Sequence, residues 1–309
     1  MFLEHFVEQK YGKAIREENI SAWRRAISGN LTSCFRPHDP HETDLDYLDR
    51  NKFVVDIQKA RFKKLPSDYK KLSDAEIMEV NEDPVRASVL PRQEAGIRPA
   101  CALPYELYVN GALMDGGSAF SIRFKAGADV HGSRSAGSPF NVYLRNVDST
   151  VKESGSGLIA STYVVKAGDQ LEETFPLALF EDGNYSCDVH GPNGFFRSFK
   201  GGANGPRLDI NVLYERNGSE PYGDLVLQLL NKGEVTLDLL IGDRSYRSGS
   251  RKKRIGKEHT VMVPLSLRRS RGWYDVTVEA KGFSFLARYA GRVETGSAGF
   301  TDPLMGGLV

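Results

Sequence analysis

Two stretches of the sequence, "GNYSCDVHGPNGFFRSFKG" at 183–201 and "GWYDVTVEAKGFSFLARYAG" at 272–291, are loose copies of one β-hairpin. Each has two runs with apolar residues at every second position, separated by a turn that contains glycine. Because side chains along a strand alternate between its two faces, one set of each run is expected to point into a core. The expected inward residues of the first run are Tyr185, Cys187 and Val189 in one copy and Tyr274, Val276 and Val278 in the other.

The similarity of the two copies extends upstream of the hairpins. Gly168 stands as far before Pro176 as Gly256 stands before Pro264, and the shift between the copies is 88 residues. Two further single-residue additions align Phe195 with Phe285, Phe199 with Tyr289 and Gly201 with Gly291. A repeat of this length indicates two modules of one topology.

The rest of the chain after about residue 100 continues the pattern of strands. Alternation is clear in three further runs, at Tyr105, Leu107 and Val109, at Phe120, Ile122 and Phe124, and at Phe140, Val142 and Leu144. The turn "NKG" at 231–233 is expected to join its two flanking strands as a hairpin. The predicted fold is mainly β, with one β-sandwich module at 101–203 and a second at 204–309, and with no sheet continuous between them.

Residues 1–100 differ from this pattern. Apolar spacing predicts amphipathic helices at 2–10 and 21–28, and "SDAEIMEV" at 73–80 is the only other stretch that is expected to be helical. Six prolines interrupt the polar segment that follows residue 34. Residues 1–100 together hold too little apolar material for a hydrophobic core of their own, so they are expected to be the end of a larger domain.

Composition and motifs exclude several classes of function. The chain has 41 basic and 40 acidic residues, so no global charge selects a nucleic acid or a membrane as partner. Its aromatic residues lie mostly at inward positions, as core residues would, which argues against base stacking. Phosphate-binding glycine loops and zinc-hydrolase motifs are absent from the sequence. Alternation sends Cys187 to the face opposite Asp188 and His190, which argues against a metal site there. No cofactor, metal ligand or catalytic residue is predicted, and no paired nucleophile accompanies the six histidines, His5, His38, His41, His131, His190 and His259.

One charged stretch stands out. The sequence "RSYRSGSRKKR" at 244–254 collects six cations around a Ser-Gly centre, which is expected to be a flexible turn. Such a cluster is typical either of a solvated hairpin loop or of a contact with anionic lipid headgroups. The candidate lipid-contact residues are Arg244, Arg247, Arg251, Lys252, Lys253 and Arg254.

Several stretches resemble the C-terminal part of bacterial phosphocholine-preferring phospholipase C. They are "FLEHFVEQKYG" at 2–12, "ENISAWRRAISGNLTSCF" at 18–35, "LPRQEAGIRPACALPYELYV" at 90–109, the closing hairpin region at 270–296, and "DPLMGG" at 302–307. The resemblance implies a parent with an upstream α/β domain of the alkaline and acid phosphatase superfamily. That domain hydrolyses phosphatidylcholine and often sphingomyelin, releases phosphocholine, and carries the catalytic and metal-binding residues.

By this resemblance, residues 1–100 are the end of the catalytic domain plus a linker. Its helices would pack on that domain through Phe2, Phe6, Trp23 and Ile27. The chain itself is expected to be non-catalytic and to support the parent or to present it to membranes. The parent family is exported, whereas this sequence shows no signal peptide and would stay in the cytoplasm if made alone. Two alternatives stay open: a stand-alone tandem β-sandwich binding module, and a small hydrolase with a constellation of its own.

Overall fold

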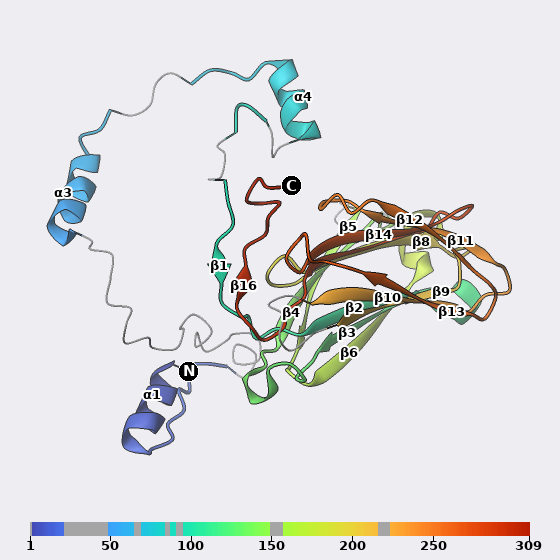
Figure 1. Ribbon diagram of the computed structural model, residues 1–309, viewed down its shortest axis with the longest axis horizontal. Coiled ribbons are helices and arrows are strands. Elements are labelled where there is room, and N and C mark those ends of the chain that lie inside the picture. Colours follow the sequence, from blue (N-terminus) through green and yellow to red (C-terminus); the bar gives the residue numbers. More distant parts are fainter. Residues whose placement is uncertain are drawn as a thin grey trace. The chain divides into compact units, whose positions relative to one another are not determined.

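The structure is a computed structural model that describes residues 2–21, 49–64, 69–83, 87–90, 95–148, 157–215 and 223–309. Residues 1–35 and 95–309 form one compact unit, and residues 36–94 form another. Figure 1 shows the helices and strands of both units, with labels on most of them. The β-rich unit holds the repeat.

The first module contains seven strands in two sheets. β2 (Leu107–Leu113), β3 (Ala119–Ala126) and β6 (Asp169–Pro176) form a three-stranded sheet in the order β2-β3-β6. The other four strands are adjacent in the order β5-β4-β7-β8, and they are β4 (Ser138–Arg145), β5 (Leu158–Val165), β7 (Asn184–His190) and β8 (Phe196–Gly202). The inward residues predicted from alternation are buried, including Tyr185, Cys187 and Val189.

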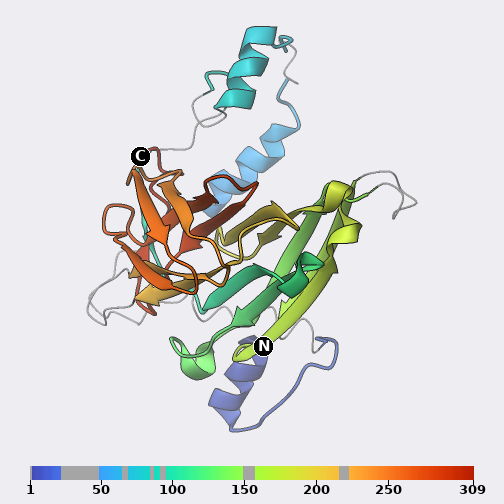
Figure 2. The same ribbon diagram turned by 90° about the vertical axis from the view of Figure 1, so that its right-hand side faces the viewer.

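The second module repeats this connectivity strand for strand. Its three-stranded sheet has the order β9-β10-β13, formed by β9 (Leu208–Glu215), β10 (Asp224–Asn231) and β13 (Thr260–Leu265). The other four strands are adjacent in the order β12-β11-β14-β15, and they are β11 (Leu237–Asp243), β12 (Ser250–Ile255), β14 (Trp273–Ala280) and β15 (Leu286–Arg292). Figure 2 shows the first module in green to yellow and the second in orange to red. The equal topology predicted from the repeat is confirmed.

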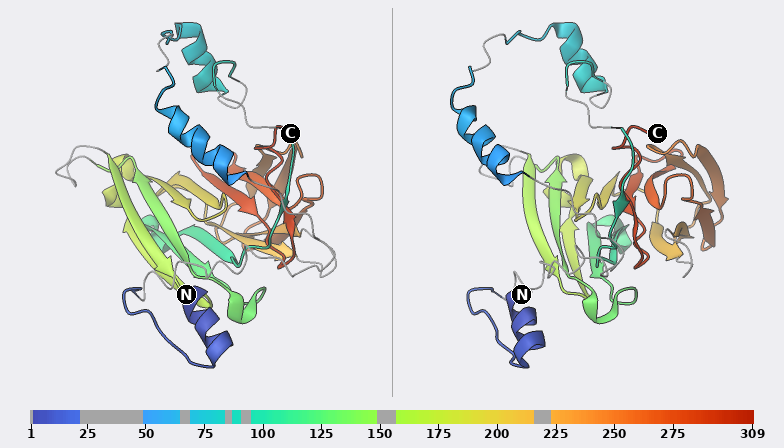
Figure 3. Two further views of the ribbon diagram at one scale, coloured as in Figure 1. Left: turned by 90° about the vertical axis from the view of Figure 1, so that its left-hand side faces the viewer. Right: turned by 60° about the vertical axis from the view of Figure 1, so that its left-hand side comes forward.

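The expectation of separate sheets is wrong. β8 pairs with β15 antiparallel, and this ladder joins four strands of each module into one eight-stranded sheet, β12-β11-β14-β15-β8-β7-β4-β5. The last strand of each module alone would leave an open row of backbone hydrogen-bonding groups, and mutual pairing satisfies both rows. One cluster of buried apolar residues accordingly runs through both modules. The strands of the joined modules can be followed from two more directions in Figure 3.

The joint between the modules has local two-fold symmetry. The hairpin alignment makes Ser198 the counterpart of Arg288, and these two residues are partners in the β8·β15 ladder. In the other layer, Asn110 donates to the side chain of Asn211 over 3.1 Å, and each is the fourth residue of its strand, β2 or β9. Corresponding positions therefore meet in both layers, as they do on the axis of a symmetric dimer.

The turn "NKG" does not form the expected hairpin. β10 pairs with β9 and β13, whereas β11 pairs with β12 and β14, so the turn crosses from one sheet to the other. Asn231 stabilises this crossing, because its buried amide donates to the carbonyls of Val235, Ile255 and Gly256. Its oxygen accepts the Gly233 amide over 3.0 Å.

Short elements complete the β-rich unit. β1 (Pro99–Ala100) pairs with β16 (Gly299–Phe300), and the two strands lie side by side in Figure 1. The Trp273 indole donates to the carbonyl of Phe300 over 3.1 Å, which fixes the C-terminal segment beside β14. In the described residues of this unit, short 3-10 turns occur at Asp115–Gly117, Gly132–Arg134, Leu177–Leu179 and Glu181–Gly183.

Three α-helices lie in the described part of the first hundred residues. α1 (Phe2–Tyr11) and α4 (Asp74–Glu82) agree with the predicted helices, and Ser73 and Glu76 form a capping box at α4. α3 (Arg50–Ala60) was not predicted. The predicted helix at 21–28 lies outside the described residues apart from Ser21. None of these helices is long and apolar enough to cross a membrane.

Exposed apolar side chains concentrate in the same part of the chain. Of 22 large apolar side chains that are exposed among the described residues, 14 precede residue 91. Examples are Phe6 of α1 and Phe53 and Ile57 of α3, whose exposed fractions are 46%, 51% and 58%. α3 and α4 bury none of their residues. The prediction that this segment makes no core of its own agrees with the described residues.

Candidate functional site

The six candidate lipid-contact cations do not share one flexible loop. Arg244 and Arg247 lie on the turn between β11 and β12, whereas Arg251, Lys252, Lys253 and Arg254 are in β12, at one edge of the eight-stranded sheet. All six are exposed. The hairpin-loop interpretation is therefore wrong for residues 251–254, which pair with β11 in a regular ladder.

The turn itself is fixed by hydrogen bonds to Asp243. One carboxylate oxygen of Asp243 accepts the amides of Ser245 and Tyr246 over 3.0 and 2.9 Å, and the other accepts the Ser248 amide over 2.9 Å. Arg247 has a φ of 56°, in the left-handed region that few residues other than glycine adopt. A flexible Ser-Gly turn was expected, and the structure shows a bonded turn instead.

Alternation along β12 divides the remaining four cations between two faces. Ile255 is buried, so Arg251 and Lys253 lie on its side, toward the three-stranded sheet. Arg251 donates to the Pro264 carbonyl of β13 over 2.7 Å, in agreement with this direction. Lys252 and Arg254 lie on the opposite, outer face of the eight-stranded sheet, where Arg254 is 3.7 Å from Asp238. A flat anionic surface on the outer face would meet only these last two.

The joint between the modules contains a group that sequence analysis missed. Arg197 of β8 is fully buried, and none of the ion pairs among the described residues includes it. Its guanidinium donates to the carbonyls of Phe196 and Ala290, each over 2.8 Å, and to the hydroxyls of Tyr214 and Tyr274, each over 3.0 Å. Four oxygen acceptors from both modules thus take the place of a carboxylate partner.

Aromatic rings surround the same guanidinium. Its carbon lies 4.0 Å from the ring centroid of Phe195, 5.3 Å from that of Tyr289 and 5.6 Å from that of Tyr274. Faces of aromatic rings attract a desolvated cation, so they offset part of the cost of burial. Burial raises the pKa of Tyr214 and of Tyr289, so both hydroxyls stay protonated at neutral pH. The arrangement joins the modules and holds no reactive group.

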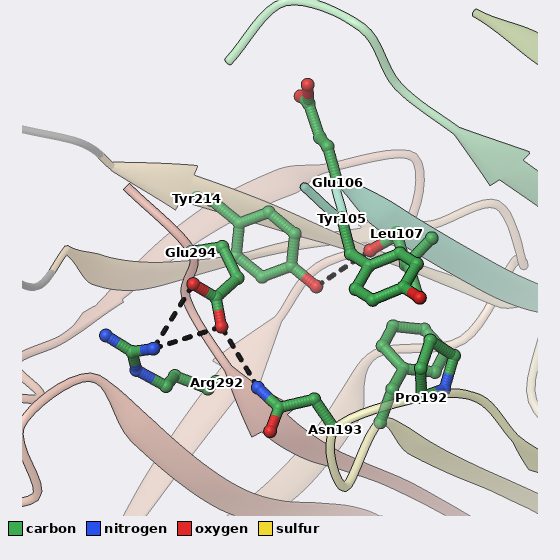
Figure 4. A pocket seen from close by; sticks show the side chains of 9 residues that line it. Tyr105, Glu106, Leu107, Pro192, Asn193, Tyr214, Arg292 and Glu294 are labelled. Atoms are coloured by element: carbon green, nitrogen blue, oxygen red, sulfur yellow. Dashed lines mark hydrogen bonds and ion pairs between the residues drawn. The ribbon is translucent and has the colours of Figure 1, made fainter. Parts of the chain in front are cut away.

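A small pocket lies next to this joint (Figure 4). Glu294 accepts hydrogen bonds there from Arg292 over 3.1 Å and from Asn193 of the β7–β8 turn over 3.0 Å. Burial raises the pKa of Glu294, and the neighbouring Arg292 opposes that shift. The Tyr214 hydroxyl donates to the carbonyl of Leu107 over 3.0 Å. Only about 20 Å³ is open to the centres of water molecules, which is room for about one water.

Glu106, the other carboxylate of this pocket, is engaged elsewhere. Its oxygens accept the backbone amides of Asp129 and Val130 and the Tyr108 hydroxyl, over 2.9, 3.1 and 2.8 Å. Figure 4 shows its carboxylate pointing away from that of Glu294. The two acids therefore do not form the facing pair that general acid and base catalysis requires.

A wider groove runs between β2 and β9, with about 300 Å³ open to water centres. Four of its charged side chains form two ion pairs: Lys232 lies 2.5 Å from Asp209, and Arg123 lies 3.1 Å from Glu172. The fifth, Arg207, donates to the backbone carbonyl of Met114. Asn110 and Asn211 bridge it, as described above. The lining carries three cations and two anions beside apolar residues of β2 and β9. The hydroxyl of Ser121 donates to Glu172 over 2.6 Å, so this carboxylate binds both Ser121 and Arg123.

The position of Cys187 confirms the inward direction that alternation predicts for it. It is fully buried and free, and burial raises its thiol pKa. Asp188 forms an ion pair with Arg145 at 2.7 Å on the outer face, so it does not join the cysteine. Among the described residues, no three His, Cys, Asp or Glu side chains gather closely enough to hold a metal ion.

A repeat-aware reading of the sequence could have found Arg197. Alternation places Arg197 and Phe199 of β8 on the inward side, with Phe195 just before the strand, and the counterpart of Arg197 in the second copy is Ala287. A charged residue at an inward position, where the other copy has a small apolar one, indicates a special environment.

Comparison with known proteins agrees with this fold. The family described as bacterial phospholipase C, C-terminal domain, matches residues 99–202 and 208–292, one segment in each module. The chain is 35% identical to a protein named Non-hemolytic phospholipase C and 31% identical to one named Hemolytic phospholipase C, both of Pseudomonas aeruginosa. It is 28% identical to the Non-hemolytic phospholipase C of Burkholderia pseudomallei.

These matches cover 97%, 97% and 98% of the chain but only 40%, 41% and 39% of the relatives, so the chain spans about two fifths of their length. The two matched family segments coincide with the two modules, and the relatives match the helical segment as well. The chain belongs to the bacterial phospholipase C family, whose C-terminal domain it contains in two copies of one fold.

Proposed function

We propose that this chain is a non-catalytic C-terminal region of a phospholipase C that hydrolyses phosphatidylcholine and sphingomyelin to phosphocholine. The match to the C-terminal domain of the family, together with a coverage of about two fifths of the relatives, carries this proposal. The buried charged groups of the described residues are engaged with their own fold: Arg197, the Arg292–Glu294 pair, Asp275 with Arg288, and Glu106 with the amides of Asp129 and Val130.

The test is a phosphocholine-release assay on the purified chain, with phosphatidylcholine and sphingomyelin as separate substrates and a full-length phospholipase C of the family as positive control. The expected result is no release above the blank for either lipid. Reproducible turnover that scales with the amount of chain would overturn the proposal and favour an enzyme in its own right.

The N-terminal helices supply the surface toward the parent. The side chain of Phe6 in α1 is 46% exposed, and α3 also exposes large apolar side chains, among them Phe53 and Ile57. The side chain of Phe2 and the residues Trp23 and Ile27, which were expected to contribute, lie outside the described part of the chain. We assign these helices to packing on the catalytic domain.

This assignment predicts that the helices bind a hydrophobic dye in the isolated chain. Replacing Phe53, Ile57 and Phe62 with Ser should lower the fluorescence of the bound dye. A matched control, Met262→Ser in β13, removes an exposed apolar side chain from the β-rich unit and should leave the signal unchanged. Equal signals from the two variants would instead favour the stand-alone binding module.

The basic residues of β12 supply the second part of the proposal, a contact with anionic lipid. A matched pair of double variants tests it: Lys252→Ser with Arg254→Ser, and Arg251→Ser with Lys253→Ser. Each double variant removes two cations from β12, but only the first removes the two that lie on the outer face of the eight-stranded sheet. Sedimentation with anionic vesicles should fall more for the first variant, and binding should fade as salt shortens the Debye length from about 10 Å at 0.1 M to about 3 Å at 1 M. Equal sedimentation of wild type and both variants would leave β12 as a solvated edge.

A further inference from the structure

The edge strands of this fold differ in how they are protected. The eight-stranded sheet ends at β5 and β12, and the outer edges of the three-stranded sheets are β6 and β13. Each presents a row of backbone groups that a strand of another molecule can pair with. Proteins usually protect such edges with charged residues, with proline or with a covering segment.

Three of the four edges carry that protection. β12 has four consecutive cations, Arg251–Arg254, and β13 contains Pro264. β6 contains Asp169, Glu172, Glu173 and Pro176. β5 has the sequence "LIASTYVV", with no charged residue, no proline and no glycine. It is the unprotected edge of the four.

β5 is also a long and regular strand. All eight of its residues pair with β4 in an unbroken register from Arg145↔Leu158 to Ser138↔Val165, so no bulge bends the edge away. Its inner face is fixed in the core, because Val165 is buried and the Tyr163 ring stacks on Phe124 with centroids 5.1 Å apart. On the outer face, Ala160 and Thr162 are exposed and small. A further strand can approach such an edge without displacing a large side chain.

We propose that β5 is a dimerisation edge, at which the β5 strands of two copies of this chain pair antiparallel and extend the two eight-stranded sheets into one. A two-fold axis at Ser161 would place Leu158 opposite Val164 of the second copy, and Ile159 opposite Tyr163. Pairs of β-branched, aliphatic and aromatic residues of this kind stabilise antiparallel strands. The contact is isologous, so it closes at two copies.

Two observations favour a second copy of β5 over other strands as the occupant. Pairing β5 with the β12 of another molecule would bring four cations against an uncharged strand, whereas β5 with β5 pairs two strands that carry no charged residue. The chain already joins its own modules by antiparallel pairing of equivalent edges at β8·β15, and the β5 edge continues that same sheet. The described regular elements before residue 95 are helices, which cannot add a strand.

The test measures the mass of the full chain by sedimentation equilibrium from micromolar to tens of micromolar concentration. Wild type should approach twice its mass of 34.3 kDa. Ala160→Lys places a charge on the exposed face of the edge and should return the mass to that of one chain. Met262→Lys adds the same charge to the β13 edge, where the side chain is 48% exposed, and should leave the dimer intact.

Hydrogen exchange identifies the interface without a substitution. The amides of residues 158–165 should exchange several-fold more slowly at high than at low protein concentration, while those of the β6 edge at 169–176 should not change. Wild type that stays monomeric throughout overturns the proposal. So does a dimer that survives Ala160→Lys with unchanged exchange at β5, because its contact would then lie elsewhere, for instance at the exposed apolar helices.

Discussion

The two modules have the same strand order, but their side chains at the joint differ. The first copy has Arg197 on its last strand where the second has Ala287. The second copy has Asp275 and Arg288 as an ion pair, at 2.7 Å, where the first has Ser186 and Ser198. The backbone pairing at the joint is thus symmetric, whereas the side chains at equivalent positions differ.

This difference shows how a repeat becomes a specific joint. Equivalent edges alone would pair as well in a register displaced by two residues, because the faces would still match. In the observed register, Arg197 donates to both Tyr214 and Tyr274. We infer that the buried guanidinium selects one alignment of the modules, as single buried polar groups do in coiled coils.

The strongest test removes that guanidinium. Arg197→Ala leaves two carbonyls and two hydroxyls without their donor and opens a cavity among three aromatic rings. The free energy of unfolding should fall by about 3 kcal/mol or more, as measured by urea denaturation. Arg123→Ala is the control, because Arg123 and Glu172 form an exposed ion pair and its loss should cost less than about 1 kcal/mol. Similar losses for the two variants would mean that Arg197 is not central to the joint.

A second test makes the second copy resemble the first. Arg288→Ser leaves the buried carboxylate of Asp275 with Ser245 as its remaining side-chain donor, and should cost about 2 kcal/mol. The double variant Asp275→Ser with Arg288→Ser restores the pair of serines found in the first copy. Its loss should be smaller than the sum of the two single losses, by about 1 kcal/mol or more. Additive losses in this cycle would show that the ion pair does not couple the strands.

The third test makes the first copy resemble the second at its inward cysteine. Cys187→Val introduces the residue of the second copy, Val276, and should change stability by less than about 1.5 kcal/mol because the volumes are similar. In wild type, the buried Cys187 should react with a thiol reagent far more slowly than the exposed Cys101. Peptide mapping by mass spectrometry separates the two sites, and rapid native labelling of Cys187 would contradict its burial.

Alternation and the repeat were enough to predict the modules and their inward residues, because both depend on local spacing. Which strands pair with each other could not be predicted from local spacing. Nothing local in the sequence of β8 or β15 distinguishes an edge that stays open from one that pairs ninety residues away. The same limit explains the turn at 231–233, where a short loop is compatible with a hairpin or with a crossing between sheets, and the buried amide of Asn231 decides.

The missed helix and the divided basic cluster have different causes. α3 was obscured by β-branched residues, Val54 and Val55, and by polar surroundings, although Asp49 caps it and Lys52 pairs with Asp56 one turn later. The charges and the Ser-Gly centre of the basic stretch are typical of a loop, although residues 251–254 form a strand. Edge strands are often charged as well, so composition alone does not separate the two.

The smallest expected effect concerns Glu294, which links the end of the second copy to the turn of the first. Burial raises its pKa above the ordinary value, so the folded state binds a proton more tightly than the unfolded state does. Stability should therefore fall as pH rises from the ordinary pKa through the folded pKa, and then become level. The difference in unfolding free energy between wild type and Glu294→Gln, measured across this window, should show that decrease.

Glu172→Gln is the control with the opposite sign. Hydrogen bonds from Ser121 and then Arg123 lower the pKa of Glu172, so its contribution is present above its ordinary pKa and is lost as pH falls through the lowered one. The effect at Glu294 should be small, because Arg292 and Asn193 offset part of its desolvation. Slopes of the same sign at both positions would contradict the buried environment of Glu294, and with it the contact across the two copies.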